Sequence, residues 1–233
     1  MRLFAIGDLH LPGGDEKPMN VFGEQWDNHF QRISEAWQSM VSPEDTVLIP
    51  GDISWAMQLK DARPDLEAIG ALPGRKILSK GNHDYWWGSI SRVREALPES
   101  VQALQHDCVE LEKCVVCGTR GWTIPTQETP LGEEDTRLLN RELVRLELSL
   151  QEAEKRLAGR PLVVMLHYPP LYDLERDTPV TRLLEQHPVH TVVYGHLHGA
   201  GIRAGFTGEE KGIRYYLTSC DALGFSPIEI PLE

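Results

Sequence analysis

Five short apolar runs in this chain are each followed directly by residues that can bind a metal or transfer a proton. The runs are rich in Val, Ile and Leu, which is typical of strands buried on both faces of a sheet. In layered α/β folds, ligands and metals collect at the carboxyl ends of such strands. The residues that follow the five runs are Asp8 and His10, then Asp52, then Asn82, His83 and Asp84, then His167, and finally His196 and His198. Because both ends of the chain would contribute to one site, we expect residues 1–233 to form a single domain.

The composition argues against several classes of partner. The 233 residues carry a net charge of −12 and contain no run of Lys or Arg, so we expect no extended nucleic-acid surface, although a short oligonucleotide could still reach a metal site. No apolar segment reaches the length needed to span a membrane. The N-terminus leads straight into a strand that carries a candidate ligand, so we expect no removable signal peptide and a cytoplasmic location.

Cys114 and Cys117 have the spacing of a zinc knuckle, but no second Cys or His pair stands at a matching distance. The two valines between them indicate a strand, in which positions three apart point to opposite faces. We therefore expect buried free thiols, which suit a reducing compartment.

Residues 134–158 are predicted to form one long helix. Its leucines and alanine keep a spacing of three and four positions, and most other positions are charged. Such a stripe usually packs against the sheet of its own domain. A helix of this length could also overhang the domain and join two copies of the chain or bind a partner.

Together, the motifs resemble those of the calcineurin-like metallophosphoesterase family. The match consists of D-x-H at 8–10, G-D at 51–52, G-N-H-D at 81–84, His167 after a strand, and G-H-x-H at 195–198. The motifs stand in the order of the family and extend over most of the chain. The resemblance implies an α/β (α+β) fold in which two mixed β-sheets pack as a sandwich flanked by helices. It also implies two divalent metal ions, and Mn, Fe or Zn suits ligands of this kind.

The resemblance further implies a role for each motif residue. The metal ligands would be Asp8, His10 and His198 at the first ion, Asn82, His167 and His196 at the second, and Asp52 as the bridge. A hydroxide that bridges the metals would be the nucleophile, because a metal pair lowers the pKa of water and binds phosphoryl oxygens. His83 would act just outside the metals as a general acid or a transition-state stabiliser, and Asp84 would orient its ring.

Three further residues are candidates for contacts with the substrate. Trp55 and Tyr85 lie close in sequence to the G-D and G-N-H-D motifs and could form a wall for a planar leaving group. Alternatively, these aromatic rings fill space beneath the loops. Arg120 lies in a glycine-flanked loop and could bind a substrate phosphate, or it could form a surface salt bridge.

The sequence therefore predicts a metal-dependent phosphohydrolase acting on small, nucleotide-like phosphodiesters. The first alternative is a phosphomonoesterase, which includes protein phosphatases, and the second is a nuclease. An alternative of another class is a non-catalytic scaffold module that docks partners through the helix at 134–158. The complete set of metal-binding residue types argues against that module.

Overall fold

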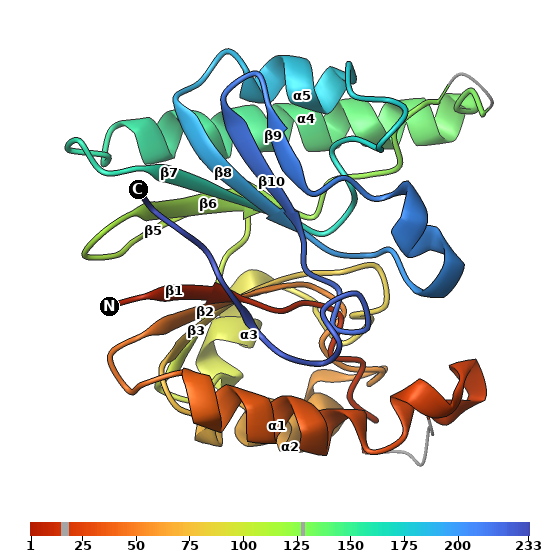
Figure 1. Ribbon diagram of the computed structural model, residues 1–233, viewed down its shortest axis with the longest axis vertical. Coiled ribbons are helices and arrows are strands. Elements are labelled where there is room, and N and C mark those ends of the chain that lie inside the picture. The colour runs from red at the N-terminus through yellow and green to blue at the C-terminus, as the bar shows by residue number, and fades with distance from the viewer. Residues whose placement is uncertain (15–18, 127–128) are drawn as a thin grey trace.

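Two mixed β-sheets lie face to face between two layers of helices in the computed structural model, which describes residues 1–14, 19–126 and 129–233 (Figure 1). The first sheet contains, in spatial order, β11 (Ile228–Glu229), β1 (Leu3–Ala5), β2 (Thr46–Pro50), β3 (Arg75–Ser79) and β4 (Val101–Ala103). The second contains β5 (Cys108–Glu110), β6 (Val115–Thr119), β7 (Leu162–Leu166), β8 (Val189–Tyr194), β10 (Ile213–Leu217) and β9 (Gly208–Glu210). The strands β11, β5 and β9 are antiparallel to their neighbours, and the other pairs are parallel.

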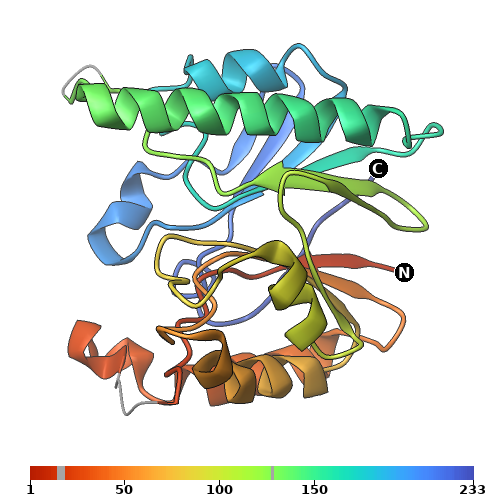
Figure 2. The same ribbon diagram turned by 180° about the vertical axis from the view of Figure 1, so that it is seen from behind.

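Helices cover the outer face of each sheet, as the front and back views show (Figures 1 and 2). The first sheet carries α1 (His29–Met40), α2 (Leu59–Ala71) and α3 (Ile90–Ala96), and the second carries α4 (Glu133–Glu154) and α5 (Pro179–Leu184). Short 3-10 helices span Met19–Phe22, Glu24–Trp26 and Gly199–Ala204. This arrangement confirms the predicted sandwich of two mixed sheets flanked by helices. Among the helices of the described ranges, none is both long and apolar enough to cross a membrane.

Alternating side chains of the strands divide the apolar interior into three layers. In β1, Phe4 packs beneath the helices of the first sheet, whereas Leu3 and Ala5 face the second sheet. In β6, Val115 and Val116 point to opposite sides in the same way. The strands are therefore buried on both faces, which explains why they appear in the sequence as continuous apolar runs.

The cysteine pair follows the same alternation. Cys114 lies in the layer between the sheets, and Cys117 lies in the layer beneath α4. Both are free thiols and fully buried. The prediction of buried thiols on opposite faces is confirmed, and these two residues form no joint metal site.

The long helix α4 lies over the second sheet (Figure 2), and its predicted apolar stripe packs into the core beneath it. Leu139, Leu146 and Leu150 are buried in that core, so the stripe is not free to dock a partner. Whether another face of α4 joins two copies of the chain stays a prediction. The helix ends at Glu154 and not at the predicted position 158. A helix through position 158 is excluded, because Ala158 and Gly159 have φ values of 46° and 83°, in the left-handed region.

A buried lysine fixes the connection between α2 and β3. Lys76 is fully buried, and its Nζ donates hydrogen bonds to the carbonyl oxygens of Gly70, Leu72 and Gly74 at 3.0, 2.7 and 2.9 Å. These carbonyls close the carboxyl end of the helix and the turn after it.

We expect Lys76→Met to lower the free energy of unfolding by about 2–4 kcal/mol, because buried acceptors without partners cost about 1–3 kcal/mol each. Urea denaturation measures the change. The exposed Lys113→Met serves as the control and should change stability by less than about 0.5 kcal/mol. Equal stability of the two variants would contradict the role given to the ammonium group.

Candidate metal centre

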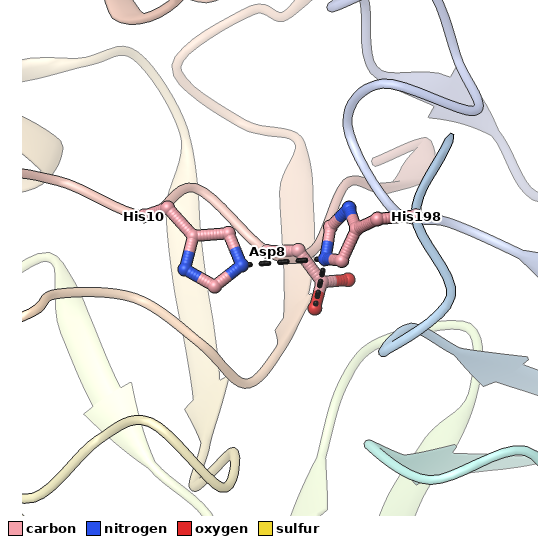
Figure 3. A group of neighbouring side chains, drawn as sticks. All are labelled: Asp8, His10 and His198. Carbon is pink, nitrogen blue, oxygen red and sulfur yellow. Dashed lines mark hydrogen bonds and ion pairs between the residues drawn. The ribbon is translucent and has the colours of Figure 1, made fainter. Parts of the chain in front are cut away.

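The predicted donor residues come together where strands of both sheets end. Asp8 and His10 follow β1, and His198 follows β8. The Nε2 atom of His198 lies 3.5 Å from Oδ1 of Asp8 and 3.3 Å from Nε2 of His10. Figure 3 shows one nitrogen of His198 pointing toward both the His10 ring and the Asp8 carboxylate. This first donor group (Asp8, His10 and His198) has a composition and spacing that could hold a metal ion.

A second donor group consists of Asn82, His167 and His196. Oδ1 of Asn82 lies 2.7 Å from Nε2 of His167 and 2.8 Å from Nδ1 of His196. Nδ1 of His167 lies 3.0 Å from the carbonyl oxygen of Pro50, which requires a proton on that nitrogen. When the ring of His167 is neutral, its Nε2 carries a lone pair, and this lone pair faces the lone pairs on Oδ1 of Asn82. A cation between these atoms relieves the repulsion, so this donor set fits a divalent metal ion.

Asp52 lies between the two donor groups. Its Oδ2 is 3.8 Å from Nε2 of His10 in the first group and 3.5 Å from Nε2 of His167 in the second. Its Oδ1 accepts a hydrogen bond of 2.8 Å from the backbone N–H of His83. One carboxylate therefore faces both groups, and a second carboxylate, Asp8, is close enough to His167 to form a donor set with Asp52 as well.

Four of these donor residues have strained backbone conformations. Asp8, His10, Asp52 and His196 have φ values of 57°, 45°, 52° and 76°. Non-glycine residues rarely occupy this left-handed region, and each such conformation costs of order 1–3 kcal/mol. Strain of this kind is concentrated at functional sites, where it aims side chains that a regular strand would point elsewhere.

Two motif glycines allow the donor loops to approach one another. A Cβ atom at Gly81 would lie 2.0 Å from Oδ1 of Asp52, and one at Gly195 would lie 2.2 Å from Oδ2 of Asp8. Neither space can hold a side chain. The glycines of G-N-H-D and G-H-x-H are thus required for the donor groups to meet.

Burial and charge set the protonation of the donors. Burial lowers the pKa of His10 to about 3 and that of His196 to about 4, so both rings are neutral, the form that binds metals. Burial also raises the pKa of Asp52 to about 7, which a nearby cation would reverse. Against the effect of burial, hydrogen bonds to Asp221 and Asp8 raise the pKa of His198 to about 10. Burial alone would raise the pKa of Asp8, but the contact with His198 holds it below its usual range.

The expectation that Asp84 orients the ring of His83 is wrong. The Asp84 carboxylate is fully buried and accepts hydrogen bonds from the indole of Trp86 and from four backbone N–H groups. The backbone donors are Gly81, Asp52, Ile53 and Ser54. Burial raises the pKa of the Asp84 carboxyl, and the backbone hydrogen bonds oppose that rise. Asp84 thus ties the loop after β2 to the loop after β3, and it positions Asp52.

His83 lies at the rim of the donor groups. The centroid of its ring is 5.8 Å from that of His10 and 4.5 Å from that of Trp55. Its Nδ1 is buried and has no hydrogen-bond partner in the described part of the chain. Burial lowers the pKa of His83. The ring also borders a cavity, so a ligand bound in that cavity would lie beside His83.

The three predicted substrate residues lie in different surroundings. Trp55 stacks on His10, with ring centroids 4.9 Å apart, and its Nε1 donates to Sδ of Met19 at 3.2 Å. Tyr85 is 54% exposed and meets His83 edge-on at 6.2 Å. Arg120 borders another cavity, and its guanidinium lies 4.7 Å from the ring centroid of Trp122.

Asp221 is a further functional residue that the sequence motifs did not indicate. Its Oδ1 lies 2.8 Å from Nδ1 of His198, and its Oδ2 accepts a hydrogen bond from the backbone N–H of Gly199. A carboxylate on the far nitrogen of a histidine fixes its tautomer and directs the other nitrogen toward a metal. The available signal was its position soon after the strand β10, the same kind of position that the other donors occupy.

Comparison with known proteins agrees with this architecture. A family model described as calcineurin-like phosphoesterase matches residues 1–200. The Gene 66 protein of Mycobacterium phage L5 is 35% identical over 82 residues, which are 33% of this chain and 37% of that protein. The Gene 66 protein of Mycobacterium phage D29 is 36% identical over 85 residues, which are 35% of this chain and 40% of that protein. The matched segment thus spans less than half the length of either phage protein.

Two solved structures share the fold over nearly the whole chain. A protein of unknown function from Aquifex aeolicus, AQ665, has a TM-score of 0.54 at 19% identity and covers 98% of this chain and 95% of its own. Phosphopantetheinyl hydrolase from Mycobacterium tuberculosis has a TM-score of 0.54 at 16% identity and covers 92% of this chain and 87% of its own. These similarities concern the fold, whereas the family model also covers every predicted motif. The chain belongs to the calcineurin-like phosphoesterase family, as its motifs predicted.

Proposed function

We propose that the protein hydrolyses small phosphodiesters with two divalent metal ions held by the two donor groups and Asp52. The observation that carries this proposal is the position of Asp52, whose Oδ2 faces His10 on one side and His167 on the other at 3.8 and 3.5 Å. A single carboxylate placed in this way can be shared by two cations. Membership of the calcineurin-like phosphoesterase family supports a metal-dependent phosphohydrolase.

The ligand set combines three carboxylate or amide side chains with four imidazoles. This mixture suits Mn, Fe or Zn, and imidazole ligands add no negative charge, so two bound cations would keep enough positive charge to attract a phosphate ester. When bound, two such ions would lower the pKa of a water molecule and neutralise phosphoryl oxygens. Asp221 and the carbonyl oxygen of Pro50 hold His198 and His167 in the tautomers that the ions require.

His83 is the residue placed to act on the substrate. Its place at the rim, on the border of the apolar cavity, allows the ring to donate a hydrogen bond to a phosphoryl oxygen or a proton to the departing group. Asp84 contributes indirectly, because it fixes the loops that carry Asp52 and His83.

An apolar cavity beside the first donor group favours a diester over a monoester. It has a volume of about 290 Å³ and is bordered by His10, His83 and His198 together with the aromatic rings of Trp26 and Trp55. Its described lining contains no Lys or Arg that could match the second negative charge of a monoester. A planar, uncharged ester group suits this surface, and a nucleoside is one example.

We expect the purified protein to contain about two metal ions per chain and, with added Mn²⁺, to prefer bis(4-nitrophenyl) phosphate to 4-nitrophenyl phosphate by at least about tenfold in kcat/KM. Elemental analysis and steady-state kinetics measure both quantities. A reversed preference would make the protein a phosphomonoesterase. Protein without metal and without activity toward either ester would favour a binding module instead. Binding to DNA at low salt should be weak, and tight binding would favour the alternative that the protein is a nuclease.

A further inference from the structure

A second cavity, of about 200 Å³, lies among residues that the proposed reaction does not use. Four cationic side chains from three segments of the chain border it: Lys80, Arg120, and Arg141 with Arg145 of α4. The acidic residue in its lining is Glu142. A concentration of positive charge in a protein whose net charge is −12 is a distinct feature, because like charges gathered in one place repel each other.

The single carboxylate does not neutralise this cavity. Glu142 is buried and accepts hydrogen bonds of 2.6 Å from both Thr119 and Arg145. Arg141 lies 3.9 Å from it. In the described part of the chain, the side chain of Arg120 makes no hydrogen bond or ion pair and is held only over the ring of Trp122. Three positive charges therefore remain in excess around an open space, which is an arrangement that binds an anion.

The cavity adjoins the metal centre through the backbone. Lys80 follows β3 and stands two residues before Asn82. The carbonyl oxygen of Arg120 accepts the backbone N–H of His167 at 3.0 Å. Side chains connect Arg120 of the cavity to the donor His196 as well: Arg120 lies over Trp122, Trp122 packs on Tyr168 at 5.3 Å, and Tyr168 packs on His196 at 4.3 Å. A single small molecule that reaches the metals could therefore place a second group in the cavity.

We propose that this cationic cavity binds a second anionic group of the substrate, a phosphate or a carboxylate, while the scissile diester lies at the metal centre. The inference rests on the proposed function and narrows its substrate class to phosphodiesters that carry a further anion. Arg120 and Arg141 are placed to grip this anion, whereas Arg145 is partly occupied by Glu142.

The test compares esters that differ only in the added anion. The reference is an alkyl 4-nitrophenyl phosphate, and the test compound of each chain length carries a terminal phosphonate on the same alkyl chain. At one chain length, we expect kcat/KM to exceed that of the reference by at least about tenfold, because charge-assisted hydrogen bonds are strong. In Arg141→Gln and Arg120→Gln the ratio should fall to about one. The matched control is Arg137→Gln, an exposed arginine of the same helix outside the cavity, and it should keep the wild-type ratio.

The outcomes separate the two proposals. A ratio of about one at every chain length in the wild-type protein overturns the inference and leaves the proposed function standing. If neither ester is hydrolysed with Mn²⁺, Fe²⁺ or Zn²⁺, the proposed function fails, and the proposed role of the cavity in substrate binding fails with it. Calorimetry then decides whether the cavity binds an anion at all. If it does, an alkane bisphosphonate should bind the wild-type protein more tightly than the alkyl monophosphonate does, and this difference should disappear in Arg141→Gln. If inorganic phosphate instead alters turnover of the reference ester in wild type but not in Arg141→Gln, the cavity holds a free ion, which also overturns the inference.

Discussion

Replacing Asp52 by asparagine is expected to remove metal from the protein and to lower kcat/KM for bis(4-nitrophenyl) phosphate by about 10²–10³-fold or more. The substitution keeps the shape of the side chain, and its Oδ1 can still accept the N–H of His83. What it removes is the negative charge of the carboxylate that faces both donor groups. An amide cannot offer that charge to two cations, so metal affinity should fall at both places.

The metal content and the melting temperature are measured together, so that a loss of metal can be told apart from a loss of the fold. Asp52→Asn should contain less than one metal ion per chain after dialysis, and excess Mn²⁺ should restore only part of the activity. The exposed Glu44→Gln makes the same chemical change far from the donor groups and should keep both metal and turnover. Full metal content and full activity in Asp52→Asn would rule out the bridging role.

The strand-end pattern predicted that the donor residues would lie close together because of the geometry of parallel strands, whereas their division into two groups came from the resemblance. Parallel neighbours such as β1 and β2 present their carboxyl ends at the same edge, so residues far apart in sequence must meet there. Burial on both faces made each of these strands visible as an apolar run. The order of the strands and their division between two sheets left no such signal, and the fold came from the resemblance.

The predictions that failed or were missing concern the direction of one side chain and contacts between residues far apart in the sequence. His83 and Asp84 are adjacent, but the tight turn sends the Asp84 carboxylate into the loop after β2, where buried N–H groups require an acceptor. Asp221 follows β10, whose alternate side chains are partly exposed, so the strand does not read as a continuous apolar run. The residues of the cationic cavity come from separate segments, so no run of basic residues in the sequence predicts it.

Replacing His83 by alanine is expected to leave the metal content unchanged and to lower turnover by about 10²–10⁴-fold. The ring belongs to neither donor group, and Asp52 keeps its contacts with His10 and His167 without it. The loss should appear in kcat, because the ring acts on the reacting group. His190→Ala, on the second sheet, is the control, and its activity should match that of the wild type.

The leaving group decides which of two roles His83 performs. If the ring protonates the departing oxygen, the loss in His83→Ala should grow as the leaving group becomes more basic and shrink for 4-nitrophenolate, which departs without a proton. If the ring instead donates a hydrogen bond to a phosphoryl oxygen, the loss should be the same for every leaving group. The cavity that Trp55 and His83 share holds the ester group beside the ring, which favours protonation of the leaving group. A series of aryl and alkyl diesters with both proteins tests this expectation, and wild-type turnover in His83→Ala on all of them would contradict either role.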